Sequence, residues 1–234
     1  MECFIVSISV GYGFKGWLTN SGGQMFVLSK SQLRSLLECN EPIDGKLLDI
    51  GAGDGNITEK LRTCVKKVMT TEISGPMVAR LKARGFTCVK TADLNHSVIQ
   101  AEKPYHLISM MNVLDRANHP ATMLRHIKTL LDRDSGRLLL AVVLPYHASV
   151  ESGTKWMSPN EQLTMTGGLC KEGASFEQAA TALYENVLVP FGFEVVRFSR
   201  VPYLSRGDVF ESFYTLSDAI FVLRQATGCP SVSQ

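Results

Sequence analysis

A glycine-rich loop flanked by acids carries the clearest chemistry in this 234-residue sequence. Residues 48–55 read LDIGAGDG, and the residues after them have the pattern of a helix. Glycine allows the backbone to turn tightly and to approach a ligand closely. The start of a helix adds N–H groups that have no partner within the helix. We therefore interpret the loop as a cofactor site whose candidate contacts are Asp49, Gly51, Ala52 and Gly53.

A second acid, Glu72, ends the next apolar run, 23 residues after Asp49. In sheets that bind nucleotides, a carboxylate at this point binds the hydroxyl groups of a ribose. The alternative interpretation is a tight turn between a strand and a helix, with a solvated Glu72. Here a strand, a glycine loop, a helix and a second strand ending in an acid follow one another in register. This combination favours a cofactor site.

The acids beside the loop indicate which cofactor it holds. Dinucleotide sites use G-x-G-x-x-G, whose third glycine packs a helix against a strand under a pyrophosphate. This loop is G-x-G-x-G and lies between Asp49 and Asp54, and two carboxylates would repel a pyrophosphate. S-adenosylmethionine has an ammonium group, a sulfonium and a ribose but no phosphate. The acids therefore favour S-adenosylmethionine, whose product after methyl transfer is S-adenosylhomocysteine.

The loop and Glu72 need a sheet to hold them, and the sequence predicts one. We expect strands at residues 46–50, 67–71, 86–90, 105–110, 138–144, 193–199 and 220–223. We expect helices at residues 29–37, 56–64, 75–84, 119–131 and 175–189. This alternation predicts an α/β fold with a parallel sheet and helices on both faces, and the last two strands, with no helix between them, should be antiparallel. Residues 145–174 are polar and are interpreted as a long active-site loop region.

Composition excludes several classes of protein. Apolar residues make up 45% and charged residues 20% of the chain, with a net charge of +2, which is typical of a globular protein. Lysine and arginine are scattered, whereas a duplex-binding domain clusters them, so we expect no nucleic-acid partner. No run reaches the roughly 18 apolar residues that a membrane-spanning helix needs. We therefore expect no membrane span.

The cysteines form no metal-binding pattern. The six have no C-x-x-C pair and no zinc spacing, and they are Cys3, Cys39, Cys64, Cys88, Cys170 and Cys229. Several lie in apolar runs, where we interpret them as small core residues rather than as a disulfide framework. Histidines and acids also lack metal-ligand spacing. We therefore expect no metal.

The motif D-x-G-x-G-x-G, with an acid ending the second strand, resembles the class I S-adenosylmethionine-dependent methyltransferases. More specifically, the chain resembles the DREV, or methyltransferase-like 9, family of protein-histidine N-pros-methyltransferases. The resemblance covers about residues 22–224. The segments that carry it are GGQMFVLSKSQLRSLL (22–37), LLDIGAGDG (47–55), TTEIS (70–74), NVLDR (112–116), GRLLLAVVLPYH (136–147), and VPYLSRGD with FYTLSDAIFVL (201–223).

The resemblance implies a Rossmann-like, seven-stranded methyltransferase sheet of order 3-2-1-4-5-7-6, with the last strand antiparallel and helices on both faces. It implies a single methyltransferase domain at residues 29–228 and a tail at 229–234. Relatives carry a longer, signal-like leader, so residues 1–28 are interpreted as an N-terminal segment with a shortened leader. The family suggests an intracellular location in the endoplasmic reticulum or mitochondrion, and this chain carries no clear signal for either. We also expect a monomer.

The resemblance also implies roles for individual residues. The implied catalytic residues are Asn112, Asp115 and Tyr214. The implied cofactor contacts beyond the loop and Glu72 are Asp93 at the adenine amine, Asn112, and Tyr203 at the methionine end. The implied substrate contacts are Asp115, His147, Tyr203 and Tyr214. From the residues alone, Asn112 and Asp115 are equally well interpreted as helix caps, the tyrosines as core residues, and Asp93 as a solvated loop residue.

The function that the resemblance implies is methylation of the pros nitrogen of histidine in protein or peptide H-x-H motifs, where x is small. A neutral imidazole already carries a lone pair at pH 7, because its reference pKa is about 6.5. The alternatives are a small-molecule N-methyltransferase acting on a histidine dipeptide, and a catalytically silent scaffold that binds the cofactor. A nucleic-acid amine methyltransferase is disfavoured, because NVLD follows the fourth strand in place of the N-P-P-Y/F signature.

Overall fold

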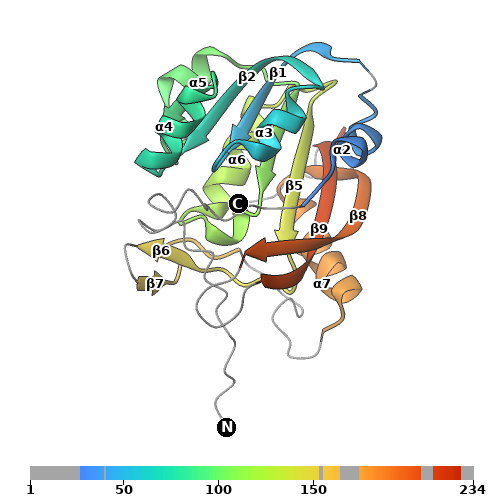
Figure 1. Cartoon of the computed structure of the whole chain (residues 1–234). Coiled ribbons are helices and arrows are strands. Elements are labelled where there is room, and N and C mark those ends of the chain that lie inside the picture. The colour runs from blue at the N-terminus through green and yellow to red at the C-terminus, as the bar shows by residue number, and fades with distance from the viewer. Residues whose placement is uncertain (1–26, 40, 153–154, 164–173, 207–212, 228–234) are drawn as a thin grey trace.

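A sheet of seven strands forms the centre of the molecule (Figure 1). The computed structural model describes residues 27–39, 41–152, 155–163, 174–206 and 213–227. The strands of this sheet are β1 (Ile43–Ile50), β2 (Val65–Glu72), β3 (Thr87–Lys90), β4 (Leu107–Met111), β5 (Arg137–Val143), β8 (Phe193–Arg206) and β9 (Phe213–Gln225). Their order is β3-β2-β1-β4-β5-β9-β8. Numbered within the sheet alone, this is the expected order 3-2-1-4-5-7-6, which is confirmed.

Strand pairing is parallel from β3 to β5 and antiparallel beyond β5. The four pairs among β1 to β5 are all parallel. β9 runs antiparallel to both of its neighbours, β5 and β8, so the expected antiparallel last strand is confirmed. β8 and β9 are longer than the apolar runs that predicted them. The reason is that their backbone pairing continues to Arg206 and Phe213.

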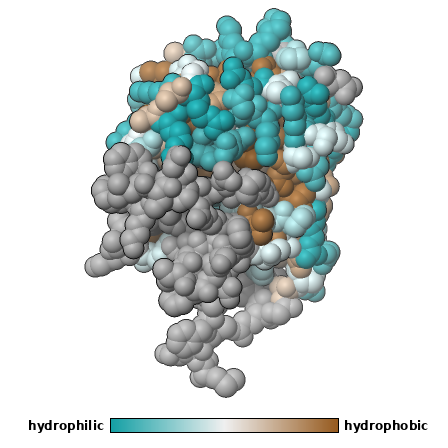
Figure 2. All heavy atoms as spheres, viewed as in Figure 1, coloured by the Kyte–Doolittle hydropathy of each residue, from teal (hydrophilic) through white to brown (hydrophobic). Residues whose placement is uncertain are grey.

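Helices cover both faces of the sheet, as expected. One face carries α2 (Lys30–Leu37), α3 (Asn56–Leu61) and α4 (Gly75–Ala83). The other carries α5 (Ser97–Ala101), α6 (Pro120–Leu130) and α7 (Phe176–Leu183). The visible surface over the upper part of the molecule, where α4 and α5 lie in Figure 1, is predominantly hydrophilic in Figure 2. The helices therefore bury one side against the sheet and expose the other.

Two of these helices begin at capping boxes. Before α2, the Oγ of Ser29 accepts the N–H of Gln32 (3.2 Å), and the N–H of Ser29 donates to Oε1 of Gln32 (2.8 Å). Ser175 and Gln178 form the same pair before α7. Each box satisfies donors that a helix leaves unpaired at its first turn. The helical segment after Ser175 continues past α7 as a π-helical turn, η2 (Tyr184–Leu188).

The core is divided into two layers by the alternation of side chains along the strands. In β1, Leu47 packs in the cluster that contains Leu33 of α2, whereas Leu48 packs in the cluster that contains Leu124 of α6. All four side chains are fully buried. Successive strand residues point to opposite faces, and a sheet covered on both faces therefore needs a continuous apolar run. This is why β5 reads RLLLAVV.

The order of the sheet reverses between β1 and β4, and this reversal creates the site. β1 pairs with β2 on one side and with β4 on the other. The helices that follow these strands lie on opposite faces, because α3 packs in one core layer and α6 in the other. The two connections therefore diverge and leave a crevice at the carboxyl ends of β1 and β4.

The region expected to be a long loop contains a short hairpin. Its strands are β6 (Val150–Ser152) and β7 (Lys155–Met157), which pair antiparallel. Strands of three residues are too short to give a recognisable sequence pattern, and the five-residue α5 was missed for the same reason. None of the helices in the described ranges is long and apolar enough to cross a membrane.

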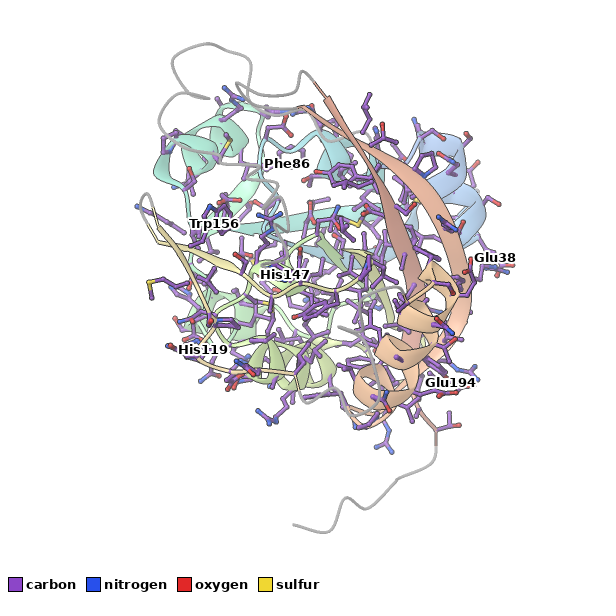
Figure 3. The ribbon with its side chains drawn as sticks, turned by 90° about the horizontal axis from the view of Figure 1, so that it is seen from below. Glu38, Phe86, His119, His147, Trp156 and Glu194 are labelled. Carbon is purple, nitrogen blue, oxygen red and sulfur yellow. A yellow bond between two sulfur atoms is a disulfide. The ribbon has the colours of Figure 1, made fainter. Side chains whose placement is uncertain are left out.

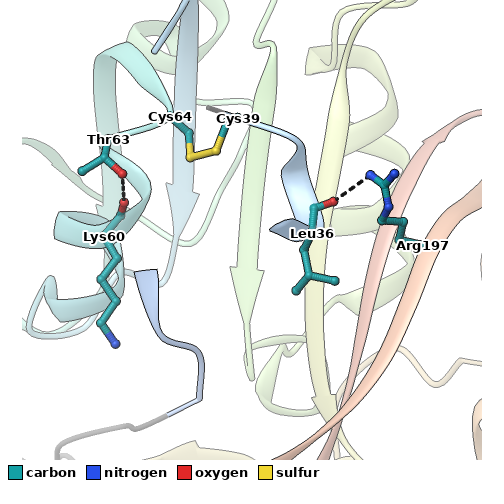
Figure 4. The surroundings of a disulfide bond; sticks show 6 residues. All are labelled: Leu36, Cys39, Lys60, Thr63, Cys64 and Arg197. Atoms are coloured by element: carbon teal, nitrogen blue, oxygen red, sulfur yellow. Dashed lines mark hydrogen bonds between the residues drawn. A yellow bond between two sulfur atoms is a disulfide. The ribbon is translucent and has the colours of Figure 1, made fainter. Parts of the chain in front are cut away.

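A disulfide joins Cys39 and Cys64 (Figure 4). The interpretation of the cysteines as unpaired core residues is therefore wrong for these two, although Cys88 is a buried free thiol. The pair is 25 residues apart in sequence, a separation without a recognisable spacing. Packing of α2 against α3 in one core layer brings the two Cα atoms to 5.4 Å. The same end of α2 is held to β8, because the guanidinium of Arg197 donates to the carbonyl of Leu36 (3.3 Å).

Replacing both bridged cysteines, Cys39→Ala with Cys64→Ala, should lower the free energy of unfolding by about 2–4 kcal/mol, because the crosslink restricts the unfolded chain. Urea unfolding with and without a thiol reductant measures the effect. The double variant should not respond to reductant, whereas a Cys88→Ala control should respond as the wild type does. A wild-type midpoint that is unchanged by reductant would contradict the disulfide.

Candidate active site

A cleft of about 950 Å³ opens where the order of the sheet reverses. Its walls come from the glycine loop after β1, the end of β2, the segment after β3, the turn after β4 and the segment after β5. Trp156 of β7 and His147, which precedes β6, also line the cleft and are labelled in Figure 3, where the molecule is seen from below. Ligands of open α/β sheets bind at this position, so the cleft is the candidate active site.

The glycine loop packs closely against the turn after β4. Gly51 and Gly53 have φ angles of 66° and 56°, in the left-handed region that favours glycine. A Cβ atom at Gly51 would lie 2.7 Å from Cγ2 of Val113, so no larger residue fits at this point. The N–H of Ala52 donates to the carbonyl of Thr71 in β2 (3.0 Å). The loop is therefore held between β2 and the turn after β4, with its backbone facing the cleft.

The carboxylate of Asp49 anchors the loop from below. Its Oδ2 accepts the hydroxyl of Thr58 in α3 (2.5 Å), and its Oδ1 accepts the hydroxyl of Ser109 in β4 (2.6 Å). The side chain is almost fully buried. The pKa of Asp49 is raised to about 6, chiefly by burial. The two hydroxyl hydrogen bonds oppose this rise, and the charge of Glu72 adds to it. Because both oxygens are used within the protein, Asp49 shapes the glycine loop.

Glu72 organises the other side of the loop. Its Oε2 accepts the N–H of Gly53 (2.9 Å), and its Oε1 accepts the N–H groups of Ile73 (2.8 Å) and Ser74 (2.9 Å). An ionised carboxylate has about four acceptor positions, so these three bonds leave capacity for one more donor. Glu72 lines the cleft. It can therefore accept a ligand hydroxyl while it holds the loop.

Asn112 and Asp218 form a hydrogen-bonded pair beneath the cleft. Asn112 follows β4 with a φ of 55°, a left-handed conformation in which asparagine is enriched. Its Nδ2 donates to Oδ2 of Asp218 in β9 (2.9 Å), and Asp218 has no exposed surface. The pKa of Asp218 is raised to about 7, chiefly by burial. The hydrogen bond from Asn112 opposes this rise, and the charge of Asp115 adds to it.

Asp115 lies in a 3-10 turn, η1 (Leu114–Arg116), that follows β4. Its side chain is buried, with Oδ2 3.5 Å from Nε of Arg116. Burial raises the pKa of Asp115, while the charges of Arg116 and His147 lower it. The guanidinium of Arg116 lies over the ring of Trp156, 5.5 Å from its centroid, which is within the range of a cation–π contact. The turn and the β6–β7 hairpin therefore meet at one side of the cleft.

The structure does not support the interpretation of Asn112 and Asp115 as helix caps. The residue at the cap position of η1 is Val113, and no side chain caps this turn. Both side chains line the cleft instead. They are therefore available to a ligand.

Three buried acceptor atoms around this turn have no hydrogen-bond partner among the residues that the structure describes. They are the Oδ1 atoms of Asn112, Asp115 and Asp218. A buried acceptor without a donor costs free energy, and an anionic ligand beside two carboxylates would add repulsion. The group therefore favours a ligand that brings N–H donors or positive charge.

The structure brings most of the predicted site residues to the cleft. Its lining includes Asp49, Gly51, Ala52, Gly53, Glu72, Asp93, Asn112, Asp115, His147 and Tyr203. Asp93 is exposed, and its Oδ1 accepts the N–H of Asn95 (2.8 Å). Tyr203 is buried in β8. The backbone of Tyr214 pairs with Ser205, but its side chain lies outside the described residues. The binding roles of these residues stay predictions.

Sequence reasoning missed four side chains that shape the site, namely Thr58, Ser109, Arg116 and Asp218. The position of Asp218 could have indicated its role, because it stands directly before the apolar run 219–223. An acid in a buried strand is costly unless it has a partner. Ser109 gave no such indication, since it meets Asp49 only through the register of β1 with β4. Arg116 gains its place through Trp156, which lies forty residues later in the sequence.

The charges of the lining suit the predicted cofactor. The described lining contains five carboxylates, from Asp49, Asp54, Glu72, Asp93 and Asp115, but only one arginine, Arg116. A ligand with phosphate groups would be repelled there, whereas one with an ammonium group and a sulfonium would be attracted. Glu72 has acceptor capacity for a ribose hydroxyl. Within the described ranges, no three histidine, cysteine or acidic side chains gather as metal ligands.

Comparison with known families and structures bears on this cleft. Residues 13–225 match the model of the family described as DREV methyltransferase. This match covers the glycine loop, the turn after β4 and both strands of the β8–β9 pair.

Several solved structures are similar to this chain in fold. The N-methyltransferase NodS from Bradyrhizobium japonicum, solved in complex with S-adenosyl-L-homocysteine, has a TM-score of 0.50 and 16% identity, over 84% of this chain and 85% of its own. The [4+2]-cyclase SpnF has a TM-score of 0.51 and 16% identity, over 84% and 81%. The YcgJ protein from Bacillus subtilis has a TM-score of 0.50 and 11% identity, over 83% and 97%. At these identities the likeness shows the fold.

Glu72→Gln should weaken S-adenosylhomocysteine binding by about tenfold to a hundredfold, because a hydrogen bond to a charged acceptor contributes about 1.5–3 kcal/mol. Calorimetric titration measures the dissociation constant. Glu59→Gln is a matched control, because Glu59 is exposed in α3 and pairs with Arg62. An unchanged dissociation constant in a folded Glu72→Gln variant would refute the assignment of Glu72 to the cofactor.

Proposed function

The chain belongs to the DREV methyltransferase family, and we propose that it methylates histidine in proteins. The proposed target is the pros nitrogen, Nδ1, of a histidine within an H-x-H motif in which x is small. The observation that carries this proposal is the group of three buried acceptors, Asn112, Asp115 and Asp218, which have no donor among the described residues. An imidazole supplies an N–H donor and becomes cationic when it is methylated, so it suits these acceptors.

The proposed cofactor is S-adenosylmethionine, which when bound supplies an electrophilic methyl group on a positively charged sulfur. Glu72 would hold the ribose, and the backbone of Gly51 to Gly53 would lie against the cofactor. Asp93 would accept from the adenine amine, and Tyr203 would cover the methionine end. Support for this assignment comes from the acidic lining of the cleft, from the family and from the resemblance in fold to NodS.

The protein must select one nitrogen of the target ring. A neutral imidazole needs no strong base, since its lone pair is already free at pH 7. Attack by Nδ1 requires the ring proton to rest on Nε2, and the group that accepts from Nε2 decides the tautomer. Asp115 suits this role, because its buried Oδ1 has no partner in the described part of the chain and its side chain lines the cleft.

The same carboxylate would stabilise the charge that develops during the reaction. As the ring takes the methyl group, its two nitrogens share a positive charge, and the Nε2 proton is lost to solvent afterwards. Burial disfavours the ionised form of Asp115 and raises its pKa. A cationic ring beside Asp115 would lower this pKa again, because an opposite charge nearby favours the ionised carboxylate. A carboxylate that is already in position before the reaction stabilises the transition state, in which the positive charge of the ring develops.

The surface beside the reacting site would bind the peptide. His147, Trp156 and Tyr203 line the cleft, and the Arg116–Trp156 contact gives its wall a flat aromatic face. Tyr214 is proposed to contact the target ring, on the resemblance alone, since its side chain lies outside the described residues. The proposed partners are therefore protein or peptide substrates, and the proposed assembly is a monomer.

Incubation of the protein and S-adenosylmethionine with H-x-H peptides should give a pros-methylated histidine, identified by mass spectrometry with isomer standards. Peptides with either histidine replaced by alanine are the matched controls, and a histidine dipeptide tests the small-molecule alternative. Methylation of the dipeptide alone would favour the small-molecule enzyme. No product from any substrate, with the cofactor bound, would favour the silent scaffold.

Asp115→Asn should lower the rate of methyl transfer by about 10²–10³, as the loss of a preorganised electrostatic partner does, and should lower S-adenosylhomocysteine affinity much less. The amide keeps the shape of the carboxylate but loses its charge, and its N–H supports the wrong tautomer. Single-turnover kinetics and calorimetry measure the two effects. Asp134→Asn, an exposed change, is the control. A normal rate together with a lowered melting temperature would mean that Asp115 is only structural.

A further inference from the structure

We infer that Asp218 is a positioning residue that fixes which end of the Asn112 amide faces the ligand. Asp218 would hold the Nδ2 end of the amide and thereby turn Oδ1 outward as an acceptor for an N–H group. This inference rests on the proposed function for the identity of the ligand, but its geometry concerns only the chain itself. The N–H donor would be the ammonium group of the cofactor or the ring of the substrate.

The backbone around Asn112 is fixed, but its amide is not. The N–H of Asn112 donates to the carbonyl of Ala141 in β5 (2.9 Å), and its φ of 55° holds a tight turn after β4. These constraints set where the side chain starts. The two ends of an amide have almost the same shape, so a rotation of 180° about the last side-chain bond exchanges a donor for an acceptor. Only a hydrogen-bond partner can choose between the two orientations.

Asp218 makes that choice above a pH of about 7, where its carboxylate is ionised and can only accept hydrogen bonds. Its Oδ2 lies 2.9 Å from Nδ2 of Asn112, so the amide must direct its N–H toward β9. Asp218 reaches this position from the far side of β5, where the register pairs it with Val143. Oδ1 of Asn112 is then the atom left buried and without a partner among the described residues. Asn112 lines the cleft, so this oxygen is the acceptor available to a ligand.

Packing does not explain an acid at this position. Asp218 has no exposed surface, it has one described hydrogen-bond donor, and its Oδ1 has none in the described part of the chain. The group that faces it from the turn after β4 is Asp115, whose negative charge disfavours a second ionised carboxylate. A buried charge with so few partners costs stability. A residue that destabilises its own surroundings needs a functional reason, and the orientation of Asn112 supplies one.

The Asp218→Asn variant tests this inference because stability and function should change in opposite directions. The amide removes the buried charge, so the melting temperature at pH 8 should be equal to or above that of the wild type. It also allows the Asn112 side chain to flip, so methyl transfer to an H-x-H peptide should fall about tenfold or more. A Glu194→Gln change on β8, which only loosens the exposed pair with Arg224, should leave the rate unchanged.

Two further measurements identify the donor and exclude a merely structural role. A loss of S-adenosylhomocysteine affinity in Asp218→Asn would identify the ammonium group. A raised KM for the peptide, or a tele-methylated by-product, would identify the substrate ring. Asn112→Asp combined with Asp218→Asn should restore at least part of the lost function, because the amide then donates from β9 and a carboxylate oxygen faces the cleft. No rescue would overturn the inference.

The inference and the proposed function fail in different ways. If the wild type methylates no histidine, the proposed function fails, and the S-adenosylhomocysteine titration alone decides the role of Asp218. An Asp218→Asn variant with unchanged affinity, and with an unchanged rate wherever a rate exists, would overturn the inference. A variant that is both unstable and normally active when folded would also overturn it, since Asp218 would then be only structural.

Discussion

The position of the cleft depends on one buried carboxylate, that of Asp49. Its two oxygens accept the hydroxyls of Thr58 and Ser109, and they join the end of β1 to α3 on one side and to β4 on the other. These are the elements that separate when the order of the sheet reverses. A buried charge loses much stability when it loses a partner, so the three elements are held in one arrangement. The glycine loop then turns over Asp49 and meets Glu72.

The site combines buried acids with too few donors of its own. Burial raises the pKa of Asp49 and of Asp218, to about 6 and about 7, and also that of Asp115. Asp115 and Asp218 each have an Oδ1 with no donor among the described residues, so a donor or a cation would favour the charged form of these two acids. Binding of a cationic ligand and ionisation of these acids are therefore coupled. The arrangement distinguishes this cleft from phosphate-binding sites on similar sheets, which need N–H groups or basic side chains around the ligand.

The fold by itself does not decide the chemistry. The same sheet supports NodS, an N-methyltransferase, and SpnF, a [4+2]-cyclase, and one fold commonly hosts several activities. In this chain the residues of the proposed chemistry lie in the turn after β4, where Asn112 and Asp115 line the cleft, and in β9, which holds Asp218.

The sequence by itself determined the alternation of strands and helices, the glycine loop and the acid at the end of β2, because each depends on residues close together in the chain. Periodicity and turn chemistry act locally, so they are readable without coordinates. The tertiary structure decided the rest. It brought Cys39 to Cys64, Ser109 to Asp49, and Asp218 to Asn112 across 106 positions of the chain. Strand register and helix packing set these contacts, and both depend on the whole buried core rather than on any local pattern.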